Sequence, residues 1–444
     1  MSAQSTPTRQ ASPVSKGPAR PPLLHKSSGA TEEYFQPYDN DRHTKLPDFM
    51  RMHGSITPRM LVPLTVVAVW STLITLISHS WYALTVDSLL LTVLGFVVGL
   101  GISFRTSSAY ERYAQGRDYW AKLSQNARDL ARHIWIHADE RHDIDPETGK
   151  EDLLAKISAL NLIVAFAVAL KHKLRFEPYT NHEDLALLVC HLDTFAGDAV
   201  SYAPQSEAKM SAWKQAGEYL GLSFATSNPR KLLKRSKRNL GNLPLEIITY
   251  LSAYTNSIVK NKTLDAGVPQ AMILGDLASL NEVLAGTERV LNTPLPVAYS
   301  IAISQITWVY VIMLPFQLWK TLGWITIPGT IVGAYIILGI AAIGREIENP
   351  FGHDVNDLPL EKFCKQLADE VNIIAARPPP TPEGWVMREE NVLLHSKSFN
   401  AWKAGSVEEI RAGLRVKAEK AAEGDVNEKR HERLAEKIQR HVPV

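Results

Sequence analysis

Long runs of apolar residues dominate the pattern along this chain of 444 residues. Four of them lack charged side chains: Leu61–Trp81, Leu89–Phe104, Pro294–Trp319 and Leu322–Gly344. Each comes close to the ~20 residues that an α-helix needs to cross the hydrocarbon core of a bilayer. They form two pairs with a short turn in each, which predicts two helical hairpins in a membrane. Buried helices of a large soluble protein are the alternative, but four uncharged runs in this arrangement favour the membrane.

Basic residues gather at the outer ends of the two predicted hairpins. The turns inside the hairpins contain a single basic residue, Lys320. Because positive charge is enriched in cytosolic segments of membrane proteins, both chain ends and the region from Thr106 to about Asn292 are predicted in the cytosol. We therefore expect a multi-pass protein of the plasma membrane or an internal membrane. The flanking residues are Arg51, Arg59, Arg105, Arg112, Arg117, Arg289 and Arg345.

A fifth apolar stretch, Leu153–Leu170, is a weaker candidate for the membrane. It contains Lys156, and if it crossed alone the basic run Arg230–Arg238 would lie on the outer side. That arrangement would reverse the usual distribution of positive charge. We expect instead a helix buried in a cytosolic helical bundle. The segment Tyr110–Trp135 supports such a bundle, because its apolar residues recur at helical spacing with charges between them.

The two ends of the chain have the composition of tails. Residues 1–45 are rich in Ser, Thr, Pro and Gln and lack the apolar core of a secretory signal, so we expect a disordered tail. Residues 376–444 open on a Pro-rich linker and end in a charged stretch, Glu408–Arg440, expected as a solvated helix without a packed face. Between the tails, the predicted order is a hairpin at 46–105, a cytosolic helical bundle at 106–292, a second hairpin at 293–345, and a loop with its following helix at 346–375.

Composition removes several classes of function. The formal net charge of +2 points to no anionic polymer, and Arg230–Arg238 is interpreted as a solvated helix face, so no nucleic-acid partner is predicted. Two cysteines, Cys190 and Cys364, exclude a disulfide framework and a cysteine-based zinc site. The 14 histidines are scattered and predict no metal site. The HExxH, GxSxG and P-loop motifs are missing from the sequence, so we do not expect an enzyme.

The second apolar run places Phe96, Leu100 and Phe104 four residues apart, so their side chains share one face of a helix. On a lone helix this pattern is a lipid-facing or core stripe. Around an axis formed by several copies of the chain, each residue becomes a ring instead. Stacked apolar rings form a constriction that gates by dewetting. The residues alone leave both interpretations open.

A polar segment follows the fourth run. Residues 347–363 (IENPFGHDVNDLPLEKF) contain four acidic residues, two asparagines and two prolines. Carboxylate and amide oxygens at this density suit a cation site, because hard cations take oxygen ligands. Asp357 has a second interpretation as the cap of the helix expected after it, because an aspartate in that place accepts backbone N–H bonds. The pattern predicts one or the other without choosing.

Four segments resemble signature segments of the bestrophin family, in the same order and at suitable separations. They are HGSITPRML (53–61), FRTSSAYERYAQGRDYWAKLSQNARDLAR (104–132), TERVLNTPLPVAYS (287–300) and EIENPFGHDVNDLPL (346–360). The resemblance covers about Leu46–Ala375 and leaves out both tails. It implies an all-α membrane protein and a homopentameric ion channel. In that family each subunit gives four transmembrane helices and a cytosolic helical bundle.

The resemblance also implies which residues line the ion pathway. Phe96, Leu100 and Phe104 match the narrow apolar neck, which the second membrane helix lines. A second constriction is implied at the cytosolic exit, where TLDAGVPQ (263–270) falls. Val268 is the apolar candidate there.

In animal bestrophins the segment that matches NPFGHDVND holds calcium. The resemblance therefore implies Asp354 and Asp357 as carboxylate ligands and Asn349 as a backbone or amide ligand of Ca²⁺. This sequence departs from the animal pattern, because His353 and Val355 stand where that pattern is acidic. Calcium site and helix cap both stay open at this point.

The expected function is passive conduction of chloride and other small anions. The implied partners are further copies of the chain, the anions and membrane lipids. Aromatic ring edges carry partial positive charge, so Phe96 and Phe104 suit partly dehydrated anions. An apolar neck does not fix the sign of the ion, which leaves a cation-permeable channel of the same fold as one alternative. A membrane-anchored scaffold that conducts no ion is the other.

Overall fold

The computed structural model describes residues 52, 54–82, 84–200, 240–388, 390–393 and 397–419. The tail at 1–45, the basic run at 230–238 and the charged stretch beyond residue 419 lie outside the described residues. The chain divides into two units, Met1–Pro58 and Arg59–Val444. The architecture below belongs to the second unit, apart from the first two residues of the first described helix.

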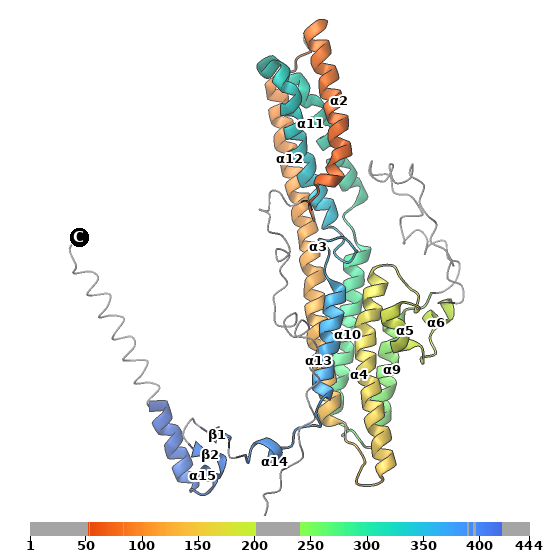
Figure 1. Cartoon of the computed structure of the whole chain (residues 1–444), viewed down its shortest axis with the longest axis vertical. Helices are drawn as coiled ribbons and strands as arrows, with labels where there is room; N and C mark the ends of the chain where they lie inside the picture. The colour runs from red at the N-terminus through yellow and green to blue at the C-terminus, as the bar shows by residue number, and fades with distance from the viewer. Residues whose placement is uncertain are drawn as a thin grey trace, which may run out of the picture. The chain divides into compact units, whose positions relative to one another are not determined.

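The four predicted membrane runs form helices that lie in two hairpins (Figure 1). The carboxylate of Asp87 starts one of them by accepting a hydrogen bond from the N–H of Leu89 at 2.8 Å. Gly323 ends another in the left-handed conformation, with φ of +53°, which glycine adopts without strain. These elements are α2 (Thr57–Ser80), α3 (Ser88–His137), α11 (Val297–Leu322), the 3₁₀ turn η2 (Gly323–Ile325) and α12 (Thr326–Glu346).

Small residues and a short apolar cluster hold the two hairpins together. A side chain at Gly95 of α3 would lie 3.1 Å from the Tyr310 ring, so glycine permits the close approach of α11. The indole Nε1 of Trp70 on α2 donates to the carbonyl of Ile312 on α11 at 3.0 Å. The buried side chains between α3, α11 and α12 are Val98, Ile102, Ile303 and Ala341.

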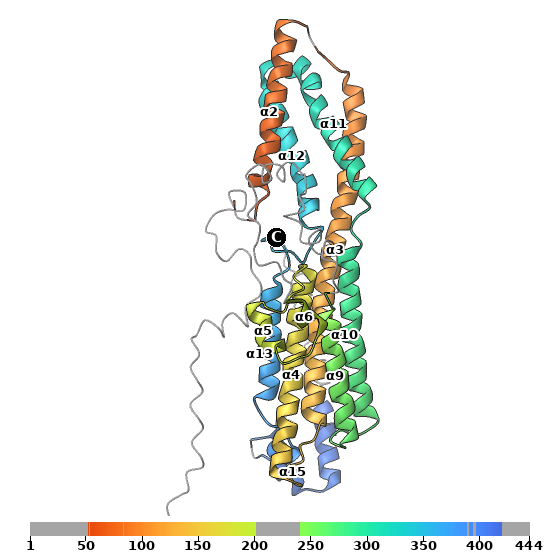
Figure 2. The ribbon, with the colours of Figure 1, turned by 90° about the vertical axis from the view of Figure 1, so that its right-hand side faces the viewer.

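Helix α3 runs without a break from the first hairpin into the helical bundle (Figure 2). Its 50 residues correspond to about 75 Å at 1.5 Å per residue. The boundary that we placed between residues 105 and 106 therefore lies inside one helix. The membrane half of α3 and its bundle half are consequently joined without a loop between them.

The second half of α3 packs with four further helices in a bundle. These are α4 (Pro146–Leu174), α9 (Leu243–Lys260), α10 (Val268–Asn292) and α13 (Leu360–Ala375). Two short helices, α5 (Glu183–Val189) and α6 (Phe195–Val200), follow α4 in the chain. The core includes large apolar side chains that are at most 1% exposed, among them Trp120, Leu123, Ile134, Ile163 and Phe166.

Residues 159–170 of α4 are mostly buried in this bundle, whereas Leu154 and Ile157 in the first half of the stretch are 54% and 38% exposed. The predicted burial of residues 153–170 is therefore confirmed for its second half. By length and composition, the helical stretches of the described chain that could cross a membrane are Thr57–Ser80, Ser88–His137, Pro146–Leu174 and Val297–Glu346, the last spanning α11, η2 and α12. In α4, 61% of the most apolar window is buried within the protein, against 22–28% in the others. The buried half of this helix therefore offers little surface to lipid.

The C-terminal region contains short elements that the sequence did not predict. After α14 (Pro382–Trp385), β1 (Val392–Leu393) and β2 (Lys397–Ser398) pair antiparallel, and α15 (Phe399–Lys403) follows directly. Residues 407–419 then form a helix. A side chain at Gly413 would lie 2.5 Å from the Trp402 ring, but the other residues of this helix are exposed apart from the half-buried Ile410. Among the described residues the charged stretch is thus a largely solvated helix, as expected.

Candidate functional site

An exposed apolar stripe runs along the first half of α3. Phe96, Leu100 and Phe104 are 73%, 46% and 58% exposed. Val98 and Ile102, on the adjoining face of the same helix, are only 4% and 5% exposed. Residues spaced by four share a helix face, so the three exposed side chains form one continuous stripe. The residues predicted for a neck therefore lie together on a surface that the described part of the chain leaves open.

Two arginines anchor α3 immediately after this stripe. The guanidinium of Arg105 is buried and lies 3.6 Å from the carboxylate of Glu348. The Nε of Arg112 donates to the carbonyl of Glu348 at 3.0 Å, and its Nη2 donates to the carbonyl of Val290 at 2.7 Å. One guanidinium can do this because it presents five donors in a rigid fork. The end of the stripe is thereby tied to the segment after α12 and to the last turns of α10.

The acidic loop, residues 347–359, connects α12 to α13 and is fastened in the core. The ring of Phe351 is completely buried. The N–H of Leu358 donates to the carbonyl of Pro350 at 2.9 Å and closes the loop. A side chain at Gly116 of α3 would lie 3.1 Å from the Phe351 ring, so glycine lets the loop approach α3 closely. The acidic loop is thus a packed element rather than a solvated connection.

Asp357 is a buried carboxylate that closes a turn inside the acidic loop. Its Oδ2 accepts a hydrogen bond from the N–H of Asp354 at 2.8 Å, and its own N–H donates to the carbonyl of Asp354 at 3.0 Å. Burial, together with the negative charges of Asp354 and Glu346, raises the pKa of Asp357 to about 6. Helix α13 begins later, with Pro359 at its N-cap and no side-chain cap among the described residues. The interpretation of Asp357 as the cap of that helix is therefore wrong.

Arg59, near the start of α2, lies between two acidic residues that come much later in the sequence. Its Nη1 is 3.0 Å from Oε2 of Glu346, and its Nη2 is 2.9 Å from Oδ1 of Asp354. The other oxygen of Glu346 accepts from Nδ2 of Asn356 at 2.7 Å. A guanidinium thus links the first hairpin to the end of α12 and to the acidic loop. The sequence analysis counted Arg59 only as a flanking charge and missed this contact.

The residues predicted for calcium are engaged by the protein itself. Asp354 is held by Arg59 and Asp357 by a backbone N–H. The acidic loop supplies no group of three His, Cys, Asp or Glu ligand atoms within 4.8 Å of one another among the described residues. Calcium needs about 6–8 converging oxygens. Calcium at Asn349, Asp354 and Asp357 stays a prediction, and it requires these contacts to open first.

Val268 is the first residue of α10 and is 74% exposed. Gly267 before it has φ of +134°, a conformation that residues other than glycine rarely adopt. Pro269 follows as the second residue of the helix, where the missing N–H costs nothing. The chain therefore turns sharply into α10 and leaves Val268 uncovered at the end of a bundle helix. Its predicted place at a second constriction is consistent with this exposure.

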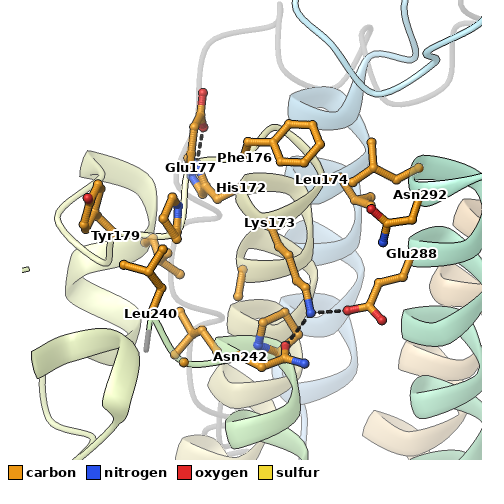
Figure 3. Close-up of a pocket in the computed structure, with 17 residues that line it drawn as sticks. His172, Lys173, Leu174, Phe176, Glu177, Tyr179, Leu240, Asn242, Glu288 and Asn292 are labelled. Atoms are coloured by element: carbon orange, nitrogen blue, oxygen red, sulfur yellow. Dashed lines mark hydrogen bonds and ion pairs between the residues drawn. The ribbon is translucent and has the colours of Figure 1, made fainter. Parts of the chain in front are cut away.

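The structure also assembles a group of polar residues that the sequence analysis missed. His172, Glu177 and His182 come together at the end of α4 from positions spaced by five residues. His172 and Glu177 line a cavity of about 260 Å³ between the end of α4, residues 240–244 and the end of α10 (Figure 3). Within the cavity Lys173 donates to Oδ1 of Asn242 at 2.7 Å and pairs with Glu288. The only sign of this group in the sequence is the regular spacing of five residues. That spacing places the three side chains on no common helix face, so it did not indicate a site.

Comparison with known proteins gives a consistent result. A family model described as "Bacterial/Fungal Bestrophin protein" matches residues 39–373. A voltage-dependent anion channel-forming protein of Nostoc sp. is 32% identical over 332 residues, which cover 74% of this chain and 91% of the relative. One of Synechocystis sp. is 33% identical over 330 residues, again covering 74% and 91%.

A solved structure matches as well. The crystal structure of a bacterial bestrophin homologue from Klebsiella pneumoniae covers 73% of this chain and 100% of that chain. The TM-score is 0.52 and the sequence identity is 22%, so this likeness shows the fold alone.

Proposed function

This chain belongs to the bestrophin family, and from that premise we propose that it forms a channel that conducts chloride and other small anions passively across a membrane. The single observation that carries the proposal is the stripe of Phe96, Leu100 and Phe104, which is exposed on α3 although the adjoining face is buried. The names of the Nostoc and Synechocystis relatives supply the sign of the permeant ion.

A channel of this kind needs several copies of the chain, and we propose a homopentamer with α3 around its axis. One chain presents the stripe on a single face and cannot enclose a path. Five copies turn each of the three residues into a ring, and three stacked apolar rings form a neck that excludes ions when it dries. The positive edges of the Phe96 and Phe104 rings favour weakly hydrated anions in that neck. Val268 supplies a second apolar ring at the cytosolic end.

We assign the outer faces of α2, α11 and α12 to membrane lipids. Large apolar side chains on these helices are exposed, as expected for a surface that meets hydrocarbon rather than water. Both chain ends and the bundle lie in the cytosol, because the basic flanks of the hairpins are on that side. Examples of the exposed side chains are Val69, Leu73, Val309, Ile336 and Ile340.

The acidic loop is the element that we propose to control the neck. It contacts α3 through Arg105 and Arg112, and it contacts the start of α2 through Arg59. A shift of the loop therefore acts on both helices of the first hairpin. Calcium enters this proposal as a competitor of Arg59 for Asp354, with Asp357 and Asn349 as the further ligands.

The triple variant Phe96→Ala, Leu100→Ala, Phe104→Ala tests the proposal. It removes all three rings, so we expect a larger conductance and a weaker preference among anions in planar bilayers. The matched control is Val69→Ala, Leu73→Ala, Leu76→Ala on α2, whose side chains are also exposed but lie outside the stripe. The control should leave current and selectivity as in the unmodified protein. Unchanged current and selectivity in the α3 variant would remove the stripe from the ion path.

A further inference from the structure

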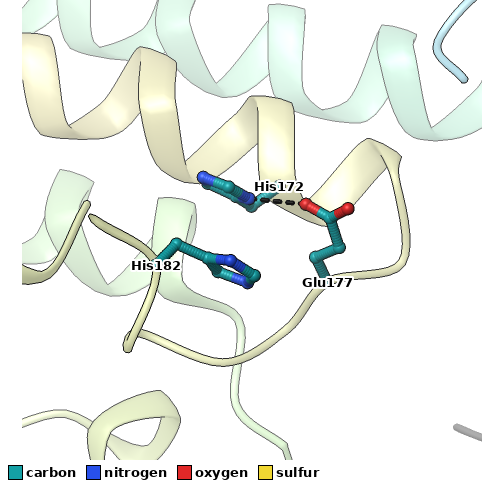
Figure 4. A group of neighbouring side chains, drawn as sticks. All are labelled: His172, Glu177 and His182. Carbon is teal, nitrogen blue, oxygen red and sulfur yellow. Dashed lines mark hydrogen bonds and ion pairs between the residues drawn. The ribbon is translucent and has the colours of Figure 1, made fainter. Parts of the chain in front are cut away.

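Three potential metal ligands meet where the chain leaves α4 and enters α5. His172 lies in the last turn of α4, Glu177 in the connecting segment, and His182 is the N-cap of α5. Their ligand atoms all lie within 4.8 Å of one another (Figure 4). The chain folds back sharply because Phe176 has φ of +62° and the N–H of Glu177 donates to the carbonyl of His172 at 2.9 Å.

The buried imidazole of His172 is held by two carboxylates. Its Nδ1 is 2.7 Å from Oε2 of Glu177, and its Nε2 is 2.8 Å from Oδ1 of Asp184. An ionised carboxylate only accepts hydrogen bonds, so each of these contacts is one that a ring N–H of His172 can make. Although burial alone would raise it, the hydrogen bonds from His172 and His353 lower the pKa of Glu177 to about 2. Glu177 is therefore an anionic ligand over the whole physiological range.

His182 completes the group with a nitrogen that has no partner. Its ring stacks on that of His172, with centroids 4.0 Å apart and planes inclined by 11°. Its Nε2 is shielded from solvent and makes no hydrogen bond with the described residues. Burial and the neighbouring charge of His172 lower the pKa of His182, which favours the neutral form of the ring. Buried polar atoms are nearly always paired, so an unpaired, buried imidazole nitrogen in a group with a second histidine and a carboxylate is a candidate metal ligand.

We propose that His172, Glu177 and His182 bind a divalent transition-metal ion of the zinc type. Two imidazole nitrogens and one carboxylate oxygen are a recurrent protein ligand set for Zn²⁺, with water in the fourth position. The ion takes the place of the proton on Nδ1 of His172, and that proton leaves to solvent. The His182 ring turns out of the stack to direct Nε2 at the ion. The cavity of about 260 Å³, which His172 and Glu177 line, provides the space for the ion and its water.

Asp184 already stands where such a site needs it. A histidine that binds a metal through one nitrogen usually donates its other N–H to a carboxylate, which fixes the ring. Nε2 of His172 makes that bond to Asp184, and Lys171 pairs with the same carboxylate. Asp184 is thus a positioning residue whose contacts exist before any ion binds.

The site is connected to the acidic loop. Oε1 of Glu177 lies 2.9 Å from Nε2 of His353, which belongs to that loop. An ion that draws on the Glu177 carboxylate weakens this bond and so acts on the loop that also holds Arg59. Regulation of current by the ion rests on the proposed channel function, whereas binding of the ion does not.

The test is titration of Zn²⁺ into the purified full-length protein by calorimetry, with Co²⁺ absorption as a second readout. We expect one ion per chain, proton release, and a cobalt spectrum of tetrahedral type. His182→Ala should lower the affinity more than 10-fold, and Asp184→Asn about 10–100-fold. His191→Ala, which removes an exposed histidine just after α5, is the matched control and should bind as the unmodified protein does.

The results of these titrations test the binding of Zn²⁺ separately from its effect on current. Equal Zn²⁺ affinity in the unmodified protein and in His182→Ala would overturn the site, as would failure of Zn²⁺ to bind. His182 makes no side-chain cap to α5, and a thermal melt of His182→Ala without metal checks that the variant keeps the fold. Binding that follows the expected pattern while bilayer current stays unchanged on adding Zn²⁺ would overturn the regulatory connection and keep the site.

Discussion

Replacement of Asp357 by asparagine tests the account of the acidic loop most sharply. The side chain is 8% exposed, and burial raises its pKa from the usual 3.8 to about 6. A native pKa above the unfolded one means that the folded protein binds more protons between these values. The contribution of Asp357 to the free energy of unfolding is therefore fully present below about pH 4. It is lost as the pH rises through 6.

The magnitude follows from the two pKa values. A difference from 3.8 to about 6 corresponds to about 3 kcal/mol at ~1.36 kcal/mol per pH unit, as an upper bound because the loop relaxes around the charge. Asparagine keeps an oxygen that accepts the N–H of Asp354 but never ionises. We expect the free energy of unfolding of Asp357→Asn, relative to the unmodified protein, to rise by up to about 3 kcal/mol between pH 4 and pH 7.

The assay is denaturant unfolding of the detergent-solubilised protein at several pH values. The difference between variant and unmodified protein cancels the titration of all other groups. Asp143→Asn, which changes an exposed aspartate, is the matched control and should give a flat difference. A flat difference for Asp357→Asn as well, or a difference that falls between pH 4 and pH 7, would refute the reasoning that Asp357 is a destabilising buried charge.

Three further predictions address the same elements. Phe351→Ala should lower the free energy of unfolding by about 3–5 kcal/mol, because the ring is completely buried. Val355 in the same loop is exposed, so Val355→Ala should change this free energy by less than about 0.5 kcal/mol. Equal effects of the two variants in denaturant unfolding would contradict the packing described. Arg59→Gln should tighten Ca²⁺ binding measured by calorimetry, since Asp354 loses its cation; unchanged or absent binding would end the calcium prediction. Val268→Ala should alter the permeability ratio of two anions and leave unfolding unchanged, and an unaltered ratio would take Val268 out of the pathway.

Much of the fold follows from local properties of the sequence. Uncharged runs near 20 residues and charges at their ends predict membrane helices without knowledge of any contact. The buried stretch in α4 was separated from the membrane runs by the same charge argument. The continuity of α3 could not be predicted in this way, because a change from apolar to charged residues at Arg105 looks like a boundary although the backbone continues as a helix.

The site was less predictable because its contacts join distant segments. Arg59 and Asp354 are 295 residues apart, and nothing near either residue announces the pair. Asp357 precedes a helix as a capping residue would. However, Leu358 is buried and its N–H donates to the carbonyl of Pro350, and the N-cap of α13 is Pro359. The helix therefore begins too late for Asp357 to cap it. The stripe on α3 was predicted as a shared face, since helical spacing alone determines that.

The central claim, an anion-conducting channel, is tested most directly by the reversal potential of the purified protein in planar bilayers under a chloride gradient. We predict a reversal potential near the equilibrium potential of chloride. A reversal potential near that of the cation would contradict anion conduction while leaving the fold in place. Absence of current from protein shown to be pentameric would contradict the channel itself and favour a membrane-anchored scaffold.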